Sequence, residues 1–573
     1  MRGGMRGNMK QFTFKYDDNF EKKLEEFKKQ NIPQDRMLFY IYSEIFDPAG
    51  LEPVGKAIER VFPESDYLGC STSGNIVDCE LSSQISVTCV VFEKETSRFM
   101  VRSYEATAVT ADTTAREIIA ETEACPWVKA IEMYFTIPQG SFTKFCSGMD
   151  AINPDIKLFG GVSCSTDITS DNCCIFTKSG GYLKHAVVAV FYGGEDFYVE
   201  DVKITGWKPL NRAFHVTKSQ GSTLSELDGI PAYKVYSRYL GIETGQNFFY
   251  NTLEFPLFYE HNGTTILRVP VSANEDGTIT MSSDIEENSI VRLSYGDPQT
   301  IVESITEESQ SIRDFCPDIL HVFSCAARRA FWDRNNPTYE LSPFQSIAPS
   351  SGFFSHGEFI RTNHYLNQHN VTLVIAAMRE GDKPRTRRTG DENTLSLSKI
   401  PLVSRLARFI AESTRELEEA VITDGLTTLY NRKEIQSRIE NALNEAGKSE
   451  FCLIMLDIDN FKTVNDTYGH QNGDTVLKAF ADILKSKKEC ASGRWGGEEF
   501  MLLTDKNLAA ALETAEAIRK EFEKQTYDDI PCQTVSIGVT QAKSDDTVDT
   551  LCTRVDTALY EAKHTGKNRV VSA

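Results

Sequence analysis

The sequence predicts an α/β protein built from several domains, and three observations lead to that prediction. At 573 residues the chain is too long for one hydrophobic core, so two or three domains are expected. Apolar runs of strand length alternate with helix-like segments through residues 36–380. A charged segment containing Gly and Pro at residues 380–393 is typical of a domain boundary. The expected parts are an N-terminal extension (1–35), two α/β regions (36–225 and 226–380), a linker (381–422) and a C-terminal α/β domain (423–573).

Composition and net charge argue against several classes of function, namely nucleic-acid binding, membrane binding and secretion. The net charge is −21, which disfavours nonspecific binding to nucleic acid or to an anionic membrane surface. No stretch approaches the roughly 18 apolar residues that a membrane-spanning helix needs. The basic N-terminus is not followed by the apolar segment of a signal peptide. We therefore expect a cytoplasmic protein without a membrane span and without nucleic-acid binding.

Fourteen cysteines are scattered along the chain, with Cys173 and Cys174 as the only close pair and no C-x-x-C spacing. In a reducing compartment such cysteines act mostly as small buried hydrophobic residues. A redox or metal sensor is a less favoured alternative.

The N-terminal half shows strand-like runs and short polar loops. Residues 38–42, 85–92 and 185–192 are rich in strand-forming residues, whereas residues 69–74 (GCSTSG) and 159–165 (FGGVSCS) are expected to be tight loops after apolar runs. No Ser-His-Asp arrangement can be assigned, because order in the sequence does not show which residues meet in space. A phosphate-binding P-loop is not expected, since Gly566-Lys567-Asn568 lacks the required preceding glycine spacing and the following Ser or Thr.

The segment before the C-terminal domain predicts an amphipathic helix with a weak coiled-coil seam. A lone linker helix packed on its own domain is the alternative. The seam follows a 3-4-3-4-3 spacing through Val403, Leu406, Ile410, Ser413, Leu417 and Ala420.

The C-terminal domain contains two acidic elements about forty residues apart. Residues 494–500 (RWGGEEF) predict a tight β-hairpin with carboxylates at its tip, because the glycines permit φ > 0 and strand-forming residues follow. Residues 451–456 form an apolar run of strand length, and Asp457 follows at its carboxyl end, where α/β sheets place ligand chemistry. An all-oxygen site of this kind suits Mg²⁺. The alternative is that Asp457 and Asp459 only solvate a strand end; the polar residues clustered at 462–474 disfavour it.

Six segments in order give the C-terminal part its resemblance to a known family. From residue 424 onward the chain resembles a GGDEF domain, the catalytic module of diguanylate cyclases, with Glu498 in place of the signature Asp, a variant common in active members. The resemblance implies a palm-like α/β fold with a mainly antiparallel central sheet flanked by helices. The segments are 424–432 (DGLTTLYNR), 456–466 (LDIDNFKTVND), 468–474 (YGHQNGD), 496–500 (GGEEF), 535–539 (VSIGV) and 556–569 (DTALYEAKHTGKNR).

The resemblance implies condensation of two GTP molecules into cyclic di-GMP with release of two pyrophosphates, and Mg²⁺ or Mn²⁺ as cofactor. It implies that Glu498 takes the 3′-hydroxyl proton, although a carboxylate beside Mg²⁺ should be a weak base, and that Lys462 neutralises charge on the phosphates. The remaining implied roles are metal binding by Asp457, the carbonyl of Ile458, Glu498 and Glu499, guanine binding by Asn465 and Asp474, and phosphate binding by the backbone N–H groups of Asn460 and Phe461 and by Lys563 and Lys567.

Physical chemistry supports part of these assignments and leaves one alternative open. A carboxylate such as Asp474 can accept from N1–H and N2–H of guanine, a donor pair that adenine lacks, so GTP is favoured over ATP. Lys563 and Lys567 could instead only offset the dipole at a helix end.

One departure from the family concerns regulation. Many relatives carry Arg-x-x-Asp shortly before the signature glycines, where bound product inhibits the enzyme. Here residues 487–490 are KKEC, and Lys cannot form the bidentate fork of Arg. Weak or absent product inhibition through that site is therefore expected.

The family chemistry also implies a homodimer, since each cyclase subunit holds one GTP and two sites must face each other. For this reason we favour pairing of the linker helix over the lone helix. The competing function is a catalytically silent module that acts as a receptor for GTP or cyclic di-GMP; the complete set of metal and guanine residues argues against it.

Residues 36–380 resemble the N- and C-terminal halves of a FIST region, a sensory module of signal-transduction proteins. The matching segments include 69–74, 159–165, 231–241, 321–329, 352–358 and 367–373. The resemblance implies a two-part α/β sensor for a small ligand of the amino-acid type. The alternative is that its Gly-Ser-Thr loops simply turn the chain, and an enzymatic role of the region is the least favoured reading. The candidate ligand residues are Ser71, Thr72, Cys325, Arg328 and Glu358.

Overall fold

The computed structural model forms two compact units, Met1–Arg408 and Phe409–Ala573, and each is described by itself. The structure describes residues 8–45, 48–82, 85–107, 110–136, 142–165, 173–245, 247–332, 338–381, 421–445, 451–527 and 530–573, together with residues 405, 406, 409, 410, 413, 414, 417 and 419 of the linker.

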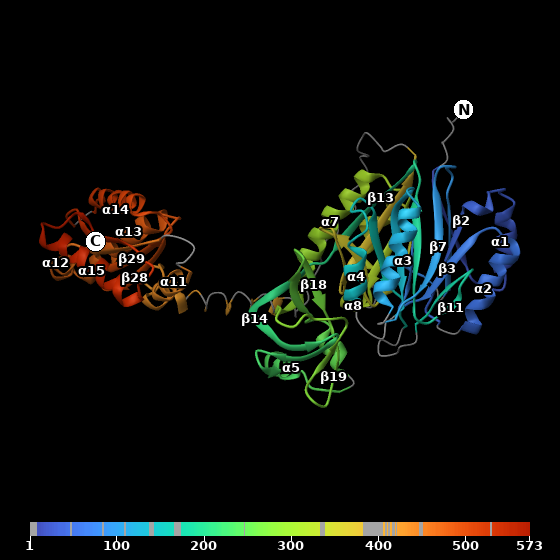
Figure 1. Ribbon diagram of the computed structural model, residues 1–573, viewed down its shortest axis with the longest axis horizontal. Helices are drawn as coiled ribbons and strands as arrows, with labels where there is room; N and C mark the ends of the chain where they lie inside the picture. The colour runs from blue at the N-terminus through green and yellow to red at the C-terminus, as the bar shows by residue number, and fades with distance from the viewer. Residues whose placement is uncertain are drawn as a thin grey trace. The chain divides into compact units, whose positions relative to one another are not determined.

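The first sheet of unit 1 (sheet 1) is built around the predicted strand at residues 38–42. Its strand order is β1-β6-β2-β3-β10-β11, with β2 and β3 parallel and the other neighbours antiparallel. Helices α1 (Phe20–Lys28) and α2 (Pro48–Val61) cover its outer face (Figure 1). Residues 10–28, expected in an extension, thus belong to the core of this unit. The strands are β1 (Lys10–Lys15), β2 (Met37–Ser43), β3 (Asp66–Ser71), β6 (Ile85–Val91), β10 (Ile175–Thr177) and β11 (Gly181–Leu183), and a 3₁₀ turn spans Gln34–Arg36.

Two further sheets combine strands from both sides of the expected boundary at residue 225. Sheet 2 has the order β25-β24-β9-β8-β12-β7, and sheet 3 has the order β13-β26-β22-β23-β4-β5. The N- and C-terminal halves therefore share these two sheets. The strands are β4 (Asn75–Val77), β5 (Glu80–Leu81), β7 (Arg98–Glu105), β8 (Val128–Phe135), β9 (Lys157–Val162), β12 (Ala186–Gly193), β13 (Phe197–Ile204), β22 (Ile319–Cys325), β23 (Ser350–Ser355), β24 (Glu358–Thr362), β25 (Tyr365–His369) and β26 (Leu373–Glu380).

A fourth, strongly bent sheet is made within residues 207–296. Its order is β18-β17-β21-β14-β15-β20-β19, with β16 paired to β15, and β14 carries a register shift between Pro209 and Ala213. Helix α5 (Ala232–Leu240) packs against β15 and β16. The strands are β14 (Trp207–Gln220), β15 (Thr223–Leu227), β16 (Ile230–Pro231), β17 (Leu257–His261), β18 (Thr264–Arg268), β19 (Pro270–Ala273), β20 (Ile279–Met281) and β21 (Ile290–Gly296).

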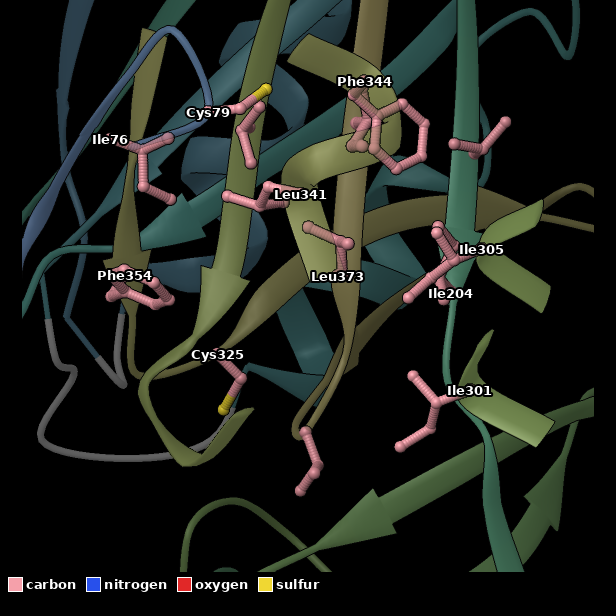
Figure 2. Packing of buried hydrophobic residues seen from close by; sticks show 14 of the residues in the cluster. Ile76, Cys79, Ile204, Ile301, Ile305, Cys325, Leu341, Phe344, Phe354 and Leu373 are labelled. Carbon is pink, nitrogen blue, oxygen red and sulfur yellow. The ribbon is translucent and has the colours of Figure 1, made fainter. Parts of the chain in front are cut away.

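The largest core of unit 1 lies on the outer face of sheet 3 (Figure 2). Ile301 and Ile305 of α7 pack there against Ile204 of β13, while Leu341 and Phe344 cover the strands beside them. Burying such side chains contributes about 1.5–3 kcal/mol each. The remaining helices of the unit are α3 (Ala111–Ala124), α4 (Thr143–Met149), α5 (Ala232–Leu240), α6 (Phe248–Thr252), α7 (Pro298–Phe315), α8 (Ala326–Phe331) and α9 (Ser342–Gln345), and a second 3₁₀ turn spans Tyr339–Leu341.

A buried polar network joins sheets 1, 2 and 3. The Glu132 carboxylate on β8 accepts from the Tyr134 hydroxyl at 2.8 Å, from Tyr192 and, at 3.4 Å, from Tyr40 of sheet 1. Nδ1 of His321 on β22 of sheet 3 lies 2.9 Å from the same carboxylate. Since a buried carboxylate without partners is costly, this network fixes how the three sheets meet.

The prediction of tight loops at residues 69–74 and 159–165 is partly wrong, because both segments begin inside strands. Gly69 lies in β3, where a Cβ would be 2.2 Å from the Phe176 ring and 2.7 Å from the Ile41 carbonyl. Gly160 lies in β9 with φ +155°, and a Cβ there would be 1.8 Å from the Met133 carbonyl. The glycines therefore permit close strand packing; they do not mark turns.

Unit 2 is a single five-stranded sheet between two layers of helices. Its order is β28-β29-β27-β30-β31, antiparallel except for the last pair, which confirms the mainly antiparallel palm-like sheet. The hairpin predicted at residues 494–500 is also confirmed. The elements are α11 (Arg432–Glu445), β27 (Cys452–Ile458), α12 (Phe461–Tyr468), α13 (His470–Ser486), β28 (Ala491–Gly496), β29 (Glu499–Thr504), α14 (Leu508–Glu523), β30 (Val535–Gln541), α15 (Val548–His564) and β31 (Val570–Ser572).

The predicted linker helix is described only in part. Leu406, Ile410, Ser413 and Leu417 of the seam have helical backbones, whereas Val403 and Ala420 lie outside the described residues. The three apolar side chains of the described seam are 51%, 56% and 67% exposed in chain order. We call these exposed apolar side chains the linker stripe.

All fourteen cysteines are free thiols, and nine of them are buried, which confirms the interpretation of most as small buried hydrophobic residues. Within the described part of the chain, no helix combines the length and the apolar character needed to cross a membrane.

Candidate active site

Strand β27 brings Asp457 to one defined face of the sheet in unit 2. Because side chains alternate along a strand, Leu453 and Met455 pack with α11 and α15, whereas Ile454 and Leu456 pack with α13 and α14 on the other face. Asp457 continues the first series. Its side chain is 9% exposed and lies beside the C-terminal end of α15.

Two further carboxylates come from the hairpin. Glu499 lies directly opposite Asp457 in the β27–β29 register, and Glu498 occupies the turn just before it. The Ile458 N–H donates to the Glu498 carbonyl at 3.3 Å, which ties the turn to the end of β27. Burial raises the pKa of Asp457 to about 6; the ammonium of Lys563 opposes this rise, and the two glutamates add to it. The site therefore concentrates negative charge that a cation would stabilise.

Lysines from the C-terminal end of α15 and the following loop reach the end of β27. Lys563 Nζ lies 2.7 Å from Asp457 Oδ2, and Lys567 Nζ donates to Asn460 Oδ1 at 2.6 Å. Asn460 has a left-handed φ of +55° and starts α12, whose first residue, Phe461, is buried. The structure thus gathers these candidate metal- and phosphate-binding residues at one sheet end.

Asp459 lies only two residues beyond Asp457, but its side chain has different hydrogen-bond partners. Its carboxylate accepts from Thr534 Oγ1 and Ser536 Oγ at 2.7 Å each and from the Asn568 N–H at 3.0 Å. The side chain is almost fully buried, at 3% exposure. Asp459 therefore ties β27 to β30 and to the C-terminal loop, a role that the sequence did not reveal.

The candidate guanine-binding residues lie where α12 and α13 approach closely. A Cβ on Gly473 would be 2.0 Å from Asn465 Oδ1, so only glycine admits the Asn465 side chain against α13. Asp474 follows this glycine and is exposed. Lys462, in the first turn of α12, is exposed as well.

A clamp on the hairpin turn was missed by sequence reasoning. The Arg494 guanidinium donates twice to the Gly497 carbonyl, at 3.0 and 2.7 Å, and also to the Asp424 carboxylate at 3.2 and 3.4 Å. Asp424 in turn accepts from the Thr427 N–H and hydroxyl at 2.9 and 2.7 Å. Asp424 directly follows the linker, so the clamp joins the linker end to the turn that carries Glu498.

The residues present fit a divalent cation by the chemistry of their donors. Asp457, Glu498 and Glu499 offer carboxylate oxygens, the donor type that Mg²⁺ and Mn²⁺ prefer, and burial together with the two glutamates raises the pKa of Asp457, so that a cation here would stabilise its ionised form. In the described residues, no three His, Cys, Asp or Glu side chains already converge as a metal cage. An ion here would therefore rely on backbone carbonyl, water or phosphate oxygens as further ligands.

The segment at residues 487–490 is engaged in surface ion pairs. Lys487 Nζ lies 2.7 Å from Glu521, and Glu489 lies 3.0 Å from Lys506. The weak product inhibition expected from this segment stays a prediction.

The candidate ligand residues of unit 1 are all buried, and most already have protein partners. Arg328 pairs with Glu340 at 2.5 Å and donates to two backbone carbonyls. Thr72 donates to Asn75 at 2.6 Å. The Ser71 hydroxyl accepts from the Cys174 N–H at 3.0 Å. These contacts are those of a folded core.

Cys325 and Glu358 form the most unusual pair among these candidates. Cys325 ends β22, where the chain turns into α8 (Figure 2). Burial raises the pKa of both side chains, well above the ordinary range for Glu358. Glu358 accepts from Ser355 at 2.6 Å and from the Thr372 N–H at 3.3 Å. Both groups are therefore held neutral.

The mainly antiparallel sheet with acids at one end is the fold that the resemblance to a GGDEF domain implied, and the family comparisons agree. Residues 421–569 match "Diguanylate cyclase, GGDEF domain", residues 37–230 match "FIST N domain" and residues 232–361 match "FIST C domain". The C-terminal domain thus matches the GGDEF family, and the segments before it match FIST N and FIST C domains.

Two of the similar curated proteins each match 28% of the chain. Diguanylate cyclase DgcM of Escherichia coli is 42% identical over 163 residues, which are 28% of this chain and 40% of that protein. Diguanylate cyclase VdcA of Vibrio cholerae is 38% identical over 173 residues, 28% of this chain and 50% of that protein. The chain thus spans about half or less of these relatives.

Among solved structures, the GGDEF domain of DgcB from Caulobacter crescentus in complex with c-di-GMP is 36% identical. The match covers 26% of this chain and 93% of that chain, with a TM-score of 0.26.

Proposed function

We propose that unit 2 is a diguanylate cyclase that condenses two GTP molecules into cyclic di-GMP and releases two pyrophosphates. The observation that carries this proposal is the placement of Asp457 opposite Glu499 and beside Glu498, with Lys563 and Lys567 at the same sheet end. Such a site combines the charges that phosphoryl transfer requires.

Each residue set would have a distinct task. Asp457, the Ile458 carbonyl, Glu498 and Glu499 would hold Mg²⁺ or Mn²⁺, which when bound neutralises phosphate charge. Lys462, Lys563, Lys567 and the N–H groups of Asn460 and Phe461 would orient the phosphates, and Asn465 with Asp474 would hold the guanine edge. Glu498 would accept the 3′-hydroxyl proton.

A product assay tests this function. Purified full-length protein is incubated with GTP and Mg²⁺, and the nucleotides are resolved by chromatography. Cyclic di-GMP should form in the wild type and not in Glu499→Gln, which keeps the shape of the side chain but removes its charge. GTP that binds without turnover would instead favour a silent receptor.

Two subunits are needed if each binds one GTP, and the linker stripe suits this pairing. Replacing Ile410 by Asp is expected to weaken self-association and lower cyclase activity by at least about tenfold, because it puts a charge in an apolar seam. Ile410 is 56% exposed in the single chain, so the fold of the subunit should be unaffected.

Sedimentation velocity and the product assay, run on the same samples, check this prediction. Arg405→Asp is the matched control, because Arg405 is a linker residue outside the seam that also has a helical backbone and is also exposed. An equal loss of self-association and activity in both variants would contradict a role of the seam in pairing. Unchanged self-association of Ile410→Asp would contradict it as well.

The raised pKa of Asp457 predicts a pH dependence. Its pKa of about 6 lies above the ordinary 3.8, so the folded state binds this proton more tightly than the unfolded chain. The unfolding free energy should therefore fall as pH rises from about 4 to about 6. Below pH 6 the proton competes with the metal, so Mg²⁺ affinity should drop about tenfold per pH unit.

Metal titrations between pH 5 and pH 8 check the second part. Affinity should level off above the pKa of Asp457 in the wild type and vary much less in Asp457→Asn. A flat profile in the wild type would show that the Asp457 proton does not control metal binding.

We further propose that the FIST domains act as a sensor whose small ligand regulates the cyclase. The neutral Cys325–Glu358 pair is the best-placed part of the candidate set, since Arg328 is occupied by Glu340. A thermal-shift screen with amino acids and related compounds tests this step. We also propose a cytoplasmic location, which GTP as the substrate and fourteen free cysteines support.

A further inference from the structure

A separate pocket lies in unit 1 beside α5 and the strand β14. Its volume is about 330 Å³, within the range of sites for small molecules. It contains none of the sensor candidates discussed above. It is lined by Arg212, Phe214, Asp228, Ile230, Lys234, Val235, Ser237, Arg238 and Tyr239.

One wall of this pocket is built for stacking. The Arg212 guanidinium lies 5.1 Å from the centre of the Phe214 ring and 5.4 Å from that of Tyr239. The two rings meet edge to face, with their centres 5.5 Å apart. Phe214 is buried, whereas Tyr239 is 41% exposed. A planar cation and a partly exposed ring therefore offer flat surfaces to an incoming planar group.

The charges of the pocket favour an anion. Arg212, Lys234 and Arg238 face a single acid, Asp228, which lies 3.7 Å from Arg212 and also accepts from the His215 N–H at 2.8 Å. Among the described residues, neither Lys234 nor Arg238 has a carboxylate within ion-pair distance. This excess of positive charge stands out in a chain with a net charge of −21.

The two unpaired cations also have a local cost. Lys234 and Arg238 are four residues apart on α5, so their charges are neighbours on one helix face. Like charges at this spacing destabilise a helix. A bound anion would remove that repulsion.

We propose that this pocket binds a nucleoside phosphate, with the base stacked at Tyr239 and Arg212 and the phosphate held by Lys234 and Arg238. Inorganic phosphate would leave the aromatic wall unused, and a neutral aromatic compound would leave the cations unpaired. Both halves of the pocket are satisfied only by a ligand that joins a flat ring to an anion. The proposal goes beyond the cyclase reaction and uses no residue of unit 2.

Equilibrium dialysis of the full-length protein with AMP, GMP and cyclic di-GMP tests the proposal, and inorganic phosphate serves as the anion without a base. The pocket is probed with Lys234→Glu, which reverses a charge, and Tyr239→Leu, which keeps apolar bulk but removes the ring. Lys218→Glu is the matched control, because Lys218 is an exposed lysine of β14 outside the pocket.

At least one nucleotide should bind to the wild type and to Lys218→Glu with equal affinity. The same nucleotide should bind at least about tenfold more weakly to Lys234→Glu and to Tyr239→Leu. Which nucleotide does so distinguishes a free mononucleotide from a cyclic dinucleotide. Any of three results would overturn the proposal. The first is an unchanged affinity of both pocket variants for every nucleotide, and the second is nucleotide binding at unit 2 alone. The third is inorganic phosphate that binds as tightly as the nucleotide. Cyclic di-GMP formation in the same variants reports on unit 2 independently.

Discussion

Asp457→Asn is expected to lower cyclic di-GMP formation by at least about 100-fold while leaving the fold intact. The substitution removes a carboxylate that would hold the metal but keeps its shape. At pH 7 ionised Asp457 costs the folded state about 3 kcal/mol, given a pKa of about 6 against an ordinary 3.8. Loss of that charge should therefore leave the stability unchanged or raise it, even though Lys563 loses a partner.

Asp459→Asn is the matched comparison, two residues away. Asp459 accepts three hydrogen bonds from Thr534, Ser536 and Asn568, whereas an amide accepts only at its oxygen and lacks the charge that strengthens these bonds. We expect about 2–4 kcal/mol of local destabilisation. Hydrogen exchange of peptides from β27 and β30, alongside the product assay, checks both variants. Equal stability loss in the two would contradict the separate roles assigned to them.

Arg494→Met is expected to lower activity by about 10- to 100-fold, because it releases the turn that carries Glu498. Two N–H groups of Arg494 hold the Gly497 carbonyl and a third reaches Asp424. The loss of charge-assisted hydrogen bonds should cost about 1.5–3 kcal/mol of local stability.

A double-mutant cycle with Asp424→Asn isolates the clamp. The two substitutions should be clearly non-additive, with a coupling of about 1 kcal/mol. Arg432→Met is the control, since Arg432 lies over the Trp495 ring at 4.7 Å and also contacts the hairpin. Wild-type turnover in Arg494→Met, or equal loss in Arg432→Met, would show that the clamp does not position the turn.

Local patterns allowed the main elements of the active domain to be predicted. The apolar run before Asp457 forms most of β27, and the predicted hairpin turns at Gly497 and Glu498. These features depend on residues close in sequence, where periodicity and turn chemistry act directly.

What the sequence could not reveal depends on remote partners. Arg494 and Asp424 are 70 residues apart, and Asp457 and Asp459 differ only in what α15, β30 and the final loop bring to them. Gly69 and Gly160 look like loop residues but lie inside strands, because neighbouring strands approach them closely. The sharing of sheets 2 and 3 between the halves of unit 1 likewise arises from long-range pairing.

The central claim is that Asp457, Glu498 and Glu499 jointly hold a divalent cation beside GTP. Mn²⁺ binding to the full-length protein, followed by electron paramagnetic resonance with 3′-deoxy-GTP as an unreactive analogue, tests it most directly. The account predicts tight nucleotide-dependent Mn²⁺ binding in the wild type that weakens at least about 100-fold in Asp457→Asn. Equal Mn²⁺ affinity in the two proteins would contradict it.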